Sequence, residues 1–146
     1  MHFKIITVGK IKNKSLSSEI DELKKRISRF KIIELKEVKE KTEDLIKRKE
    51  FEIIKPYLDK SCFNILLLES GKEFDTKEFY NKLKTTNRPI QFIITGAFGP
   101  SDELKSSCDL ILSLSKMTFT HEQALYMLVE QVYRVQCFEK GIPYTK

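Results

Sequence analysis

Five short apolar blocks, separated by stretches with helical periodicity, constrain the fold of this chain more than any other feature of its sequence. The blocks predict strands at Phe3–Val8, Ile32–Val38, Phe63–Leu68, Ile90–Thr95 and Leu110–Leu114. The third and fourth blocks are apolar without alternation, which is typical of strands buried on both faces. Strands that alternate with helices predict an α/β fold with a mostly parallel sheet and helices on both of its faces.

The stretches between the blocks predict four helices. The first has one apolar stripe, formed by Leu16, Ile20, Leu23, Ile27 and Phe30. The second is expected at about Glu43–Leu58, where Pro56 kinks or shortens it. The third begins at Asp75, which opens a capping-box sequence, and a short fourth follows Ser101.

A last helix after Thr120 carries the clearest sequence signals. Thr120 and Gln123 have the spacing of a capping box, in which each side chain satisfies a backbone N–H of the other residue. Gly141 suits the position after the helix end, and Pro143 prevents continuation. The predicted apolar face consists of Leu125, Leu128, Val129, Val132 and Val135.

The length and composition indicate one ordinary globular domain. A chain of 146 residues fits a single domain spanning residues 1–146. No apolar run approaches the roughly 18 residues of a membrane helix, and the N-terminus lacks the features of a signal peptide. The three cysteines are far apart, form no C-x-x-C and accompany only two histidines. We therefore expect a cytoplasmic protein with no membrane or metal partner, whose cysteines act as small buried apolar side chains.

The positive charge is concentrated in the first part of the chain. Residues 1–60 contain 17 Lys or Arg and 11 Asp or Glu, whereas residues 61–146 contain 10 of each. A basic part beside a neutral part fits an acidic partner bound along one face. A Lys-rich solvated surface explains the same numbers, and charge alone does not separate the two interpretations.

Three strand ends are candidate parts of a binding site, because ligands of open α/β sheets bind beyond the carboxyl ends of the strands. They are residues 68–72, 95–100 and 114–121. Gly96 and Gly99 permit close backbone approach, as ligand contacts or as plain turn residues. Their spacing matches neither a dinucleotide fingerprint nor a P-loop. Because no hydrolase motif occurs, the pattern favours a group-transfer enzyme that relies on a cofactor and on positioning.

His121 and Arg134 are the candidate polar side chains of the last helix. A helix N-terminus disfavours an imidazolium, so a neutral His121 either faces a substrate or packs at the helix start. Arg134 interrupts an apolar segment and either pairs with phosphate or carboxylate or extends to solvent. Four aromatic residues nearby suggest base stacking, core packing or a dimer interface: Tyr126, Tyr133, Phe138 and Tyr144.

Several motifs together resemble one known family. They are Ile5–Lys10, Leu66–Lys72, Thr95–Gly96, Leu114–His121, Glu130–Arg134 and Gly141–Tyr144. Over essentially its full length the chain resembles the RlmH family of SPOUT-class methyltransferases, which modify large-subunit ribosomal RNA. The resemblance implies a homodimer, a deep trefoil knot in the C-terminal part and S-adenosylmethionine as the methyl donor.

The resemblance also implies where the cofactor binds and what reaction follows. The implied cofactor residues are Leu68, Gly96, Leu114, Ser115, Lys116, Met117, Thr118 and Phe119. Such contacts are largely made by the backbone, with apolar cover for the adenine. The implied reaction is methyl transfer to N3 of a pseudouridine in the 23S rRNA of the assembled ribosome.

Three side chains form the substrate shell that the resemblance implies. Arg134 would orient the substrate, His121 would position the base or accept the N3 proton, and Tyr144 would cover the site. The family pattern has an Arg at the position of Leu125 and a His at the position of Thr145. A SPOUT methyltransferase for another RNA and a non-catalytic ribosome-binding protein that keeps the cofactor pocket stay open as alternatives.

Overall fold

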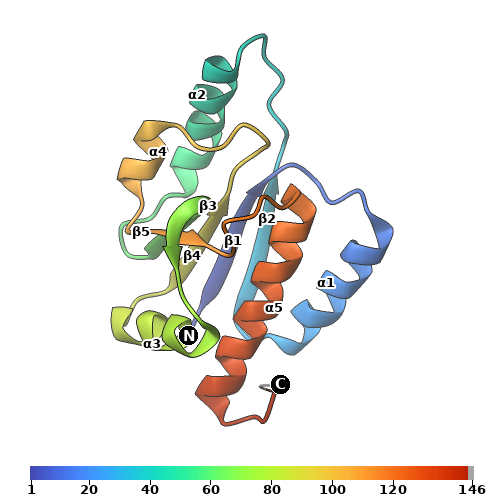
Figure 1. Cartoon of the computed structure of the whole chain (residues 1–146), viewed down its shortest axis with the longest axis vertical. Coiled ribbons are helices and arrows are strands. Elements are labelled where there is room, and N and C mark those ends of the chain that lie inside the picture. The colour runs from blue at the N-terminus through green and yellow to red at the C-terminus, as the bar shows by residue number, and fades with distance from the viewer. Residues whose placement is uncertain (145–146) are drawn as a thin grey trace.

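The computed structural model describes residues 1–144 and shows a single sheet whose five strands are all parallel (Figure 1). The strands are β1 Phe3–Val8, β2 Phe30–Leu35, β3 Phe63–Glu73, β4 Ile90–Ile94 and β5 Leu110–Ser113. Their spatial order is β2-β1-β4-β3-β5. The predicted α/β class with a parallel sheet is confirmed.

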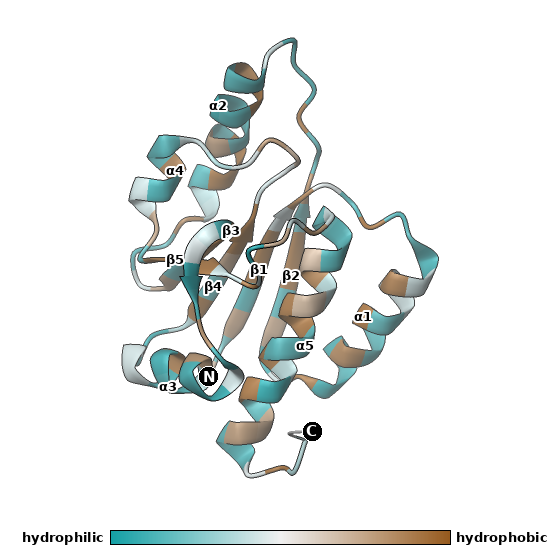
Figure 2. Cartoon of the chain, viewed as in Figure 1, coloured by the Kyte–Doolittle hydropathy of each residue, from teal (hydrophilic) through white to brown (hydrophobic). Residues whose placement is uncertain are grey.

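Helices cover both faces of this sheet, as predicted. They are α1 Lys14–Arg26, α2 Glu43–Ile54, α3 Thr76–Thr86, α4 Asp102–Ser107 and α5 His121–Lys140. Apolar residues of α1, α3 and α5 pack in one core cluster on one face. Those of α2 and α4 join a second cluster on the other face. Figure 2 shows the resulting pattern, with apolar strands in the middle and polar helix surfaces outside.

The predicted helix ends are confirmed at some positions and wrong at others. The capping boxes at Asp75 and Thr120 form, and Gly141 adopts a left-handed φ of 68° after α5. The helix before Pro56 ends at Ile54 and continues as a short 3₁₀ turn. The apolar stripe predicted for the first helix was too long, because Ile27 has extended backbone and Phe30 already belongs to β2.

Strand β3 is longer than the sequence predicted and pairs with β5 twice. It pairs through Leu67 with Leu112, leaves the ladder, and returns to Leu112 through Lys72. The end of β3 curves across β5 (Figure 1). A Cβ on Gly71 would lie 2.7 Å from the Ile111 carbonyl carbon and oxygen, so this crossing depends on glycine.

We expect Gly71→Ala to lower the free energy of unfolding by about 1–3 kcal/mol, because the added methyl group would overlap the backbone of β5. Denaturant unfolding measures the effect. The neighbouring Ser70→Ala is the control, because Ser70 is exposed on the same strand. Equal stability of the two variants would contradict the close approach.

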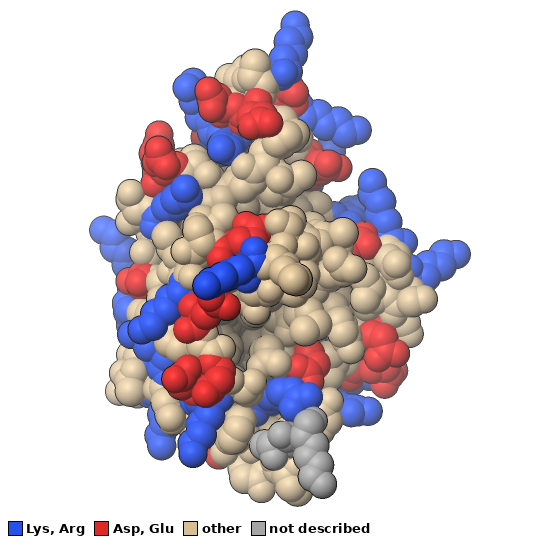
Figure 3. All heavy atoms as spheres, in the orientation of Figure 1, with Lys and Arg blue, Asp and Glu red and all other residues tan. Residues whose placement is uncertain are grey.

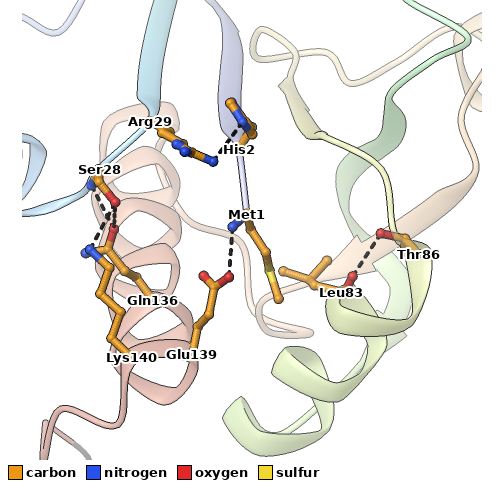
Figure 4. A network of polar contacts seen from close by, with 9 residues as sticks. All are labelled: Met1, His2, Ser28, Arg29, Leu83, Thr86, Gln136, Glu139 and Lys140. Carbon is orange, nitrogen blue, oxygen red and sulfur yellow. Dashed lines mark hydrogen bonds and ion pairs between the residues drawn. The ribbon is translucent and has the colours of Figure 1, made fainter.

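The buried side-chain amide of Gln136 connects the C-terminal half of α5 to the end of α1 and the residues after it (Figure 4). Gln136 Oε1 accepts hydrogen bonds from the backbone N–H and the hydroxyl of Ser28, at 2.7 and 2.8 Å. Its Nε2 donates to the Arg26 carbonyl at 2.8 Å. Nearby, the amino group of Met1 lies 2.9 Å from Glu139 Oε1. These contacts set the position of α5 relative to β1 and α1.

Two of the three cysteines are buried as predicted, whereas Cys108 is half-buried against the second core cluster. Cys62 and Cys137 are buried, and burial raises the pKa of the Cys108 thiol to about 12. Such thiols are poor nucleophiles. Within residues 1–144, no helix is long and apolar enough to cross a membrane and no group of side chains is suited to hold a metal ion.

Candidate cofactor and substrate site

A cavity of about 300 Å³ lies where the middle of β3 and the carboxyl ends of β4 and β5 meet the start of α5. Seven of the eight predicted cofactor residues line it: Leu68, Gly96, Leu114, Ser115, Met117, Thr118 and Phe119. His121 lines it as well. The three strand ends singled out in the sequence therefore converge on one cavity.

Lys116, the eighth predicted cofactor residue, does not line the cavity. Its side chain is 85% exposed, and Nζ lies 3.7 Å from Glu73 Oε1 at the end of β3. An exposed pair of this kind contributes little to stability. The family resemblance named every residue of this loop, but neighbouring residues of an irregular loop point in different directions, and Lys116 points away from the cavity while Ser115 and Met117 line it.

Two serines shape the loop between β5 and α5. The Ser113 hydroxyl donates to the Ser115 carbonyl at 2.9 Å, and the Ser115 hydroxyl accepts from the Met117 N–H at 3.0 Å. The loop thus turns tightly around the cavity mouth, where Met117 is 78% exposed. The capping box of Thr120 then ends the loop and begins α5.

A tight turn after β4 forms the opposite wall. Gly99 N–H donates to the Gly96 carbonyl at 3.1 Å, and Gly99 has a φ of 79° that favours glycine. Ala97 and Phe98 between them also line the cavity, and Phe98 is 46% exposed. An aromatic ring at the mouth can cover a planar ligand.

His121 is held against the end of β1. Its Nε2 lies 2.5 Å from Oγ1 of the buried Thr7. A Cβ on Gly9 would lie 3.7 Å from His121 Cε1, so the ring edge rests on this backbone. Burial lowers the pKa of His121, while the carboxylates of Glu122, Glu34 and Glu37 act in the opposite direction. The lowered pKa favours the neutral ring, and its main cause is burial rather than the helix N-terminus.

Glu122 ties the first turn of α5 to the loop after β1. Its carboxylate accepts hydrogen bonds from the backbone N–H of Lys12 and, at 3.3 Å, from that of Asn13. These two N–H groups precede α1, where backbone donors have no helical acceptor. The contact holds His121, the adjacent residue, at the edge of the cavity.

Arg134 and Tyr144 lie together, but away from His121. Arg134 Nε donates to Glu130 Oε1 at 2.6 Å, and its guanidinium carbon lies 5.0 Å from the centre of the Tyr144 ring. The Tyr133 ring meets the Tyr144 ring edge-on at 4.7 Å. Thirteen helical residues separate His121 from Arg134, which corresponds to about 20 Å along the axis. One chain therefore does not present all three predicted substrate groups to one small base.

The position where the family pattern has an Arg belongs to the core in this chain. Leu125 is fully buried in the cluster under α1, α3 and α5. Where the family pattern has a charged Arg, this chain therefore has an apolar side chain that packs in the core. The other departure, at Thr145, lies outside the described residues.

Two polar side chains that contact this site were not predicted from the sequence. Thr7 reaches His121, and Glu50 of α2 accepts a hydrogen bond from Gly96 N–H at 3.0 Å. Glu50 is four residues from both Ile46 and Ile54, so it shares their helix face. That spacing was the available signal, because a carboxylate on an apolar helix face is expected to be buried and to need a hydrogen-bond partner.

Positive and negative side chains are interspersed on the face seen in Figure 3, and this face carries no single basic patch. The concentration of positive charge in residues 1–60 is therefore a property of the sequence that does not translate into one patch on this side. The two interpretations of that charge stay predictions.

A parallel α/β sheet with a ligand-sized cavity at its carboxyl edge defines a class of proteins that bind a small molecule there. Within that class, the sequence matches the family model described as "Predicted SPOUT methyltransferase" over residues 1–145, and the chain belongs to this family. The resemblance inferred from the motifs is confirmed.

Relatives with similar sequences carry a methyltransferase name as well. The chain is 40% identical over 151 residues to "Ribosomal RNA large subunit methyltransferase H" of Dictyoglomus thermophilum, with 99% of each chain covered. It is 39% identical over 159 residues to the protein of that name from Clostridium botulinum strain Kyoto, with 100% of each covered.

A solved structure shares the fold. It is described as a probable methylase family protein from Haemophilus influenzae, and it matches with a TM-score of 0.55 and 9% sequence identity. The match covers 95% of this chain and 66% of that one, so this chain spans just under two thirds of its length. At this identity the likeness shows the fold alone.

Proposed function

We propose that this protein is a methyltransferase of large-subunit ribosomal RNA that uses S-adenosylmethionine as methyl donor and acts in the cytoplasm. The observation that supports it most is the match to relatives of that name over nearly the full length of both chains. The cavity formed by β3, β4, β5 and the start of α5 supplies a site of suitable chemistry.

The cavity fits the proposed cofactor in size and lining. Its volume of about 300 Å³ is at the lower end of the range for ligand sites. Leu68, Ile94 and Leu114 offer apolar surface to an adenine, and the loop backbone offers polar groups. Among the described residues that line it, Glu69 is the one carboxylate and no Lys or Arg is present. This charge suits a cationic sulfonium.

The proposed reaction transfers a methyl group to N3 of a pseudouridine in 23S rRNA. The bound cofactor supplies an activated methyl group on sulfur. The nitrogen must lose its proton as the new bond forms, and His121 is suited to accept it because burial favours the neutral form of its ring and the ring lines the cavity. In this role the Nε2–H of His121 donates to Thr7 Oγ1, which fixes the ring and leaves the lone pair of Nδ1 to take the proton.

A homodimer would complete the substrate site. Arg134 lies about 20 Å along α5 from His121 and beside the Tyr144 ring, so a second copy packed against α5 would supply both side chains to the cavity of the first. Met127 of α5 is 40% exposed, and the adjacent Tyr126 is half-buried at the edge of the core. Methionine and aromatic residues are enriched in the core of protein interfaces. Arg134 would then orient the RNA and Tyr144 would cover the base.

The C-terminal trefoil knot belongs to the same proposal. Its support is the double pairing of β3 with β5, which carries the end of β3 around the strand that leads into the cavity loop and α5. The knot would hold the strand ends and the loop in the close arrangement that forms the cavity.

A methylation assay tests the proposed function. We expect the purified protein to transfer a labelled methyl group from S-adenosylmethionine to ribosomes that lack the modification, and mass spectrometry should locate it at N3 of a pseudouridine. Ribosomes that already carry it are the control.

Association of the protein with the ribosome should weaken as the salt concentration rises, because phosphate contacts release counterions. Product on a different RNA, or ribosome binding without methyl transfer, would replace the proposal by one of its two alternatives.

A further inference from the structure

Helix α2 buries a carboxylate that the proposed chemistry does not use. Glu50 is 4% exposed and is the one charged side chain among the buried residues within 1–144. A buried carboxylate without a countercharge is costly, and a residue there for packing alone would be apolar. The described residues provide no ion pair to Glu50, so its role depends on the hydrogen bond that it accepts.

That hydrogen bond comes from the cavity wall. Glu50 Oε1 accepts from Gly96 N–H at 3.0 Å. A Cβ on Gly96 would lie 2.5 Å from Glu50 Oε2, so both carboxylate oxygens press on this glycine. The contact therefore needs an acceptor oxygen on a side chain of this length on one side and the absence of a side chain on the other.

We propose that Glu50 is a positioning residue of the cofactor cavity, and that its carboxylate holds the Gly96–Gly99 turn where it forms one wall. Gly96 is both the anchor of the turn, through its carbonyl contact with Gly99 N–H, and part of the lining. Moving Gly96 would shift Ala97 and Phe98, which line the same wall. The inference rests on the proposed function only for the identity of the ligand.

The ionisation of the Glu50 carboxylate offers a way to observe its contact with the Gly96 amide. Burial raises the pKa of Glu50, the Gly96 N–H opposes this, and the nearby carboxylate of Glu37 raises it further. In the unaltered protein, the NMR shift of the Gly96 amide should therefore titrate at a pH above the ordinary 4.5 of a glutamate. A Gly96 amide that does not respond to pH in this range would overturn the proposed contact without any substitution.

Variants of Glu50 separate positioning from packing. Glu50→Leu fills the space without an acceptor, whereas Glu50→Gln keeps an oxygen that can accept from Gly96 N–H. We expect Glu50→Leu to lose about tenfold to a hundredfold in affinity for S-adenosylhomocysteine by calorimetry. Its Gly96 amide should exchange with solvent at least about tenfold faster. Glu50→Gln should restore both values to within about threefold.

Ile54→Val is the matched control, because Ile54 is fully buried on the same face of α2. It should lower stability slightly and leave both the affinity and the Gly96 exchange unchanged. Wild-type affinity in Glu50→Leu, or an equal loss in Ile54→Val, would overturn the inference. If the unaltered protein bound neither S-adenosylmethionine nor S-adenosylhomocysteine, the proposed function would fail, while the exchange of the Gly96 amide would still decide whether Glu50 holds the turn.

Discussion

Replacing His121 with alanine is expected to lower the rate of methyl transfer by about a hundredfold to ten-thousandfold, the usual contribution of a positioned proton acceptor. The ring lines the cavity, and its Nε2 is held by Thr7. Single-turnover assays on unmodified ribosomes measure the rate of the chemical step. Affinity for S-adenosylhomocysteine, measured in parallel, should change much less than the rate.

The other histidine provides the control. His2 is exposed and contacts Arg29 Nη1 at 3.3 Å, far from the cavity lining. His2→Ala should therefore keep the wild-type rate. Thr7→Val preserves the shape of the buried side chain but removes its hydrogen bond, and should cost about tenfold or less. A full rate in His121→Ala would show that solvent takes the proton.

At acidic pH, the rate of methyl transfer should depend on the protonation of the His121 ring. Burial lowers the pKa of His121 below its ordinary 6.5, so the neutral form persists to a lower pH and the rate should fall only as pH drops through that lowered value. Stability changes in the same direction. The unfolded chain takes up the proton first, so the free energy of unfolding falls as pH drops from 6.5 to the folded pKa. His121→Asn should lack this component of the pH dependence of stability, as measured by thermal unfolding at several pH values.

The parts of the fold predicted from sequence are those set by neighbouring residues. β1 was predicted with its observed ends because its apolar block is bounded by polar residues. The start of α5 was predicted because Thr120 and Gln123 satisfy each other within one turn. For the same reason the cavity loop was identified, since strand, loop and helix follow one another along the chain.

The parts that were not predicted depend on contacts between distant segments. The continuation of β3 to Glu73 contains Glu69, Ser70 and Gly71, which do not favour a strand, and it forms because β5 pairs with it again. The Glu50 contact joins α2 to the end of β4 across 46 positions. Family resemblance named Arg134 and Tyr144 with His121, whereas the structure shows Tyr144 beside Arg134, far along α5 from His121 in the same chain.

That separation leads to the second large effect, which is restoration of activity by mixing two inactive variants. His121→Ala and Arg134→Ala should each lose most of their activity, because each removes one group from every site. If His121 of one protomer and Arg134 of the other serve the same site, a mixed dimer contains one site with both groups intact and one site that lacks both. Equimolar random exchange makes half of the dimers mixed, so activity should return to about a quarter of the wild-type rate.

The mixing experiment also separates this arrangement from its alternatives. If both groups acted within one chain, every site of a mixed dimer would lack one of them, and mixing would restore nothing. A monomer would likewise show no restoration. Two variants at the same position, His121→Ala and His121→Asn, are the matched control, because no pairing of them yields an intact site. The positions of His121 at the start of α5 and of Arg134 beside the Tyr144 ring favour restoration, since about 20 Å along one helix is too far for both side chains to contact one base.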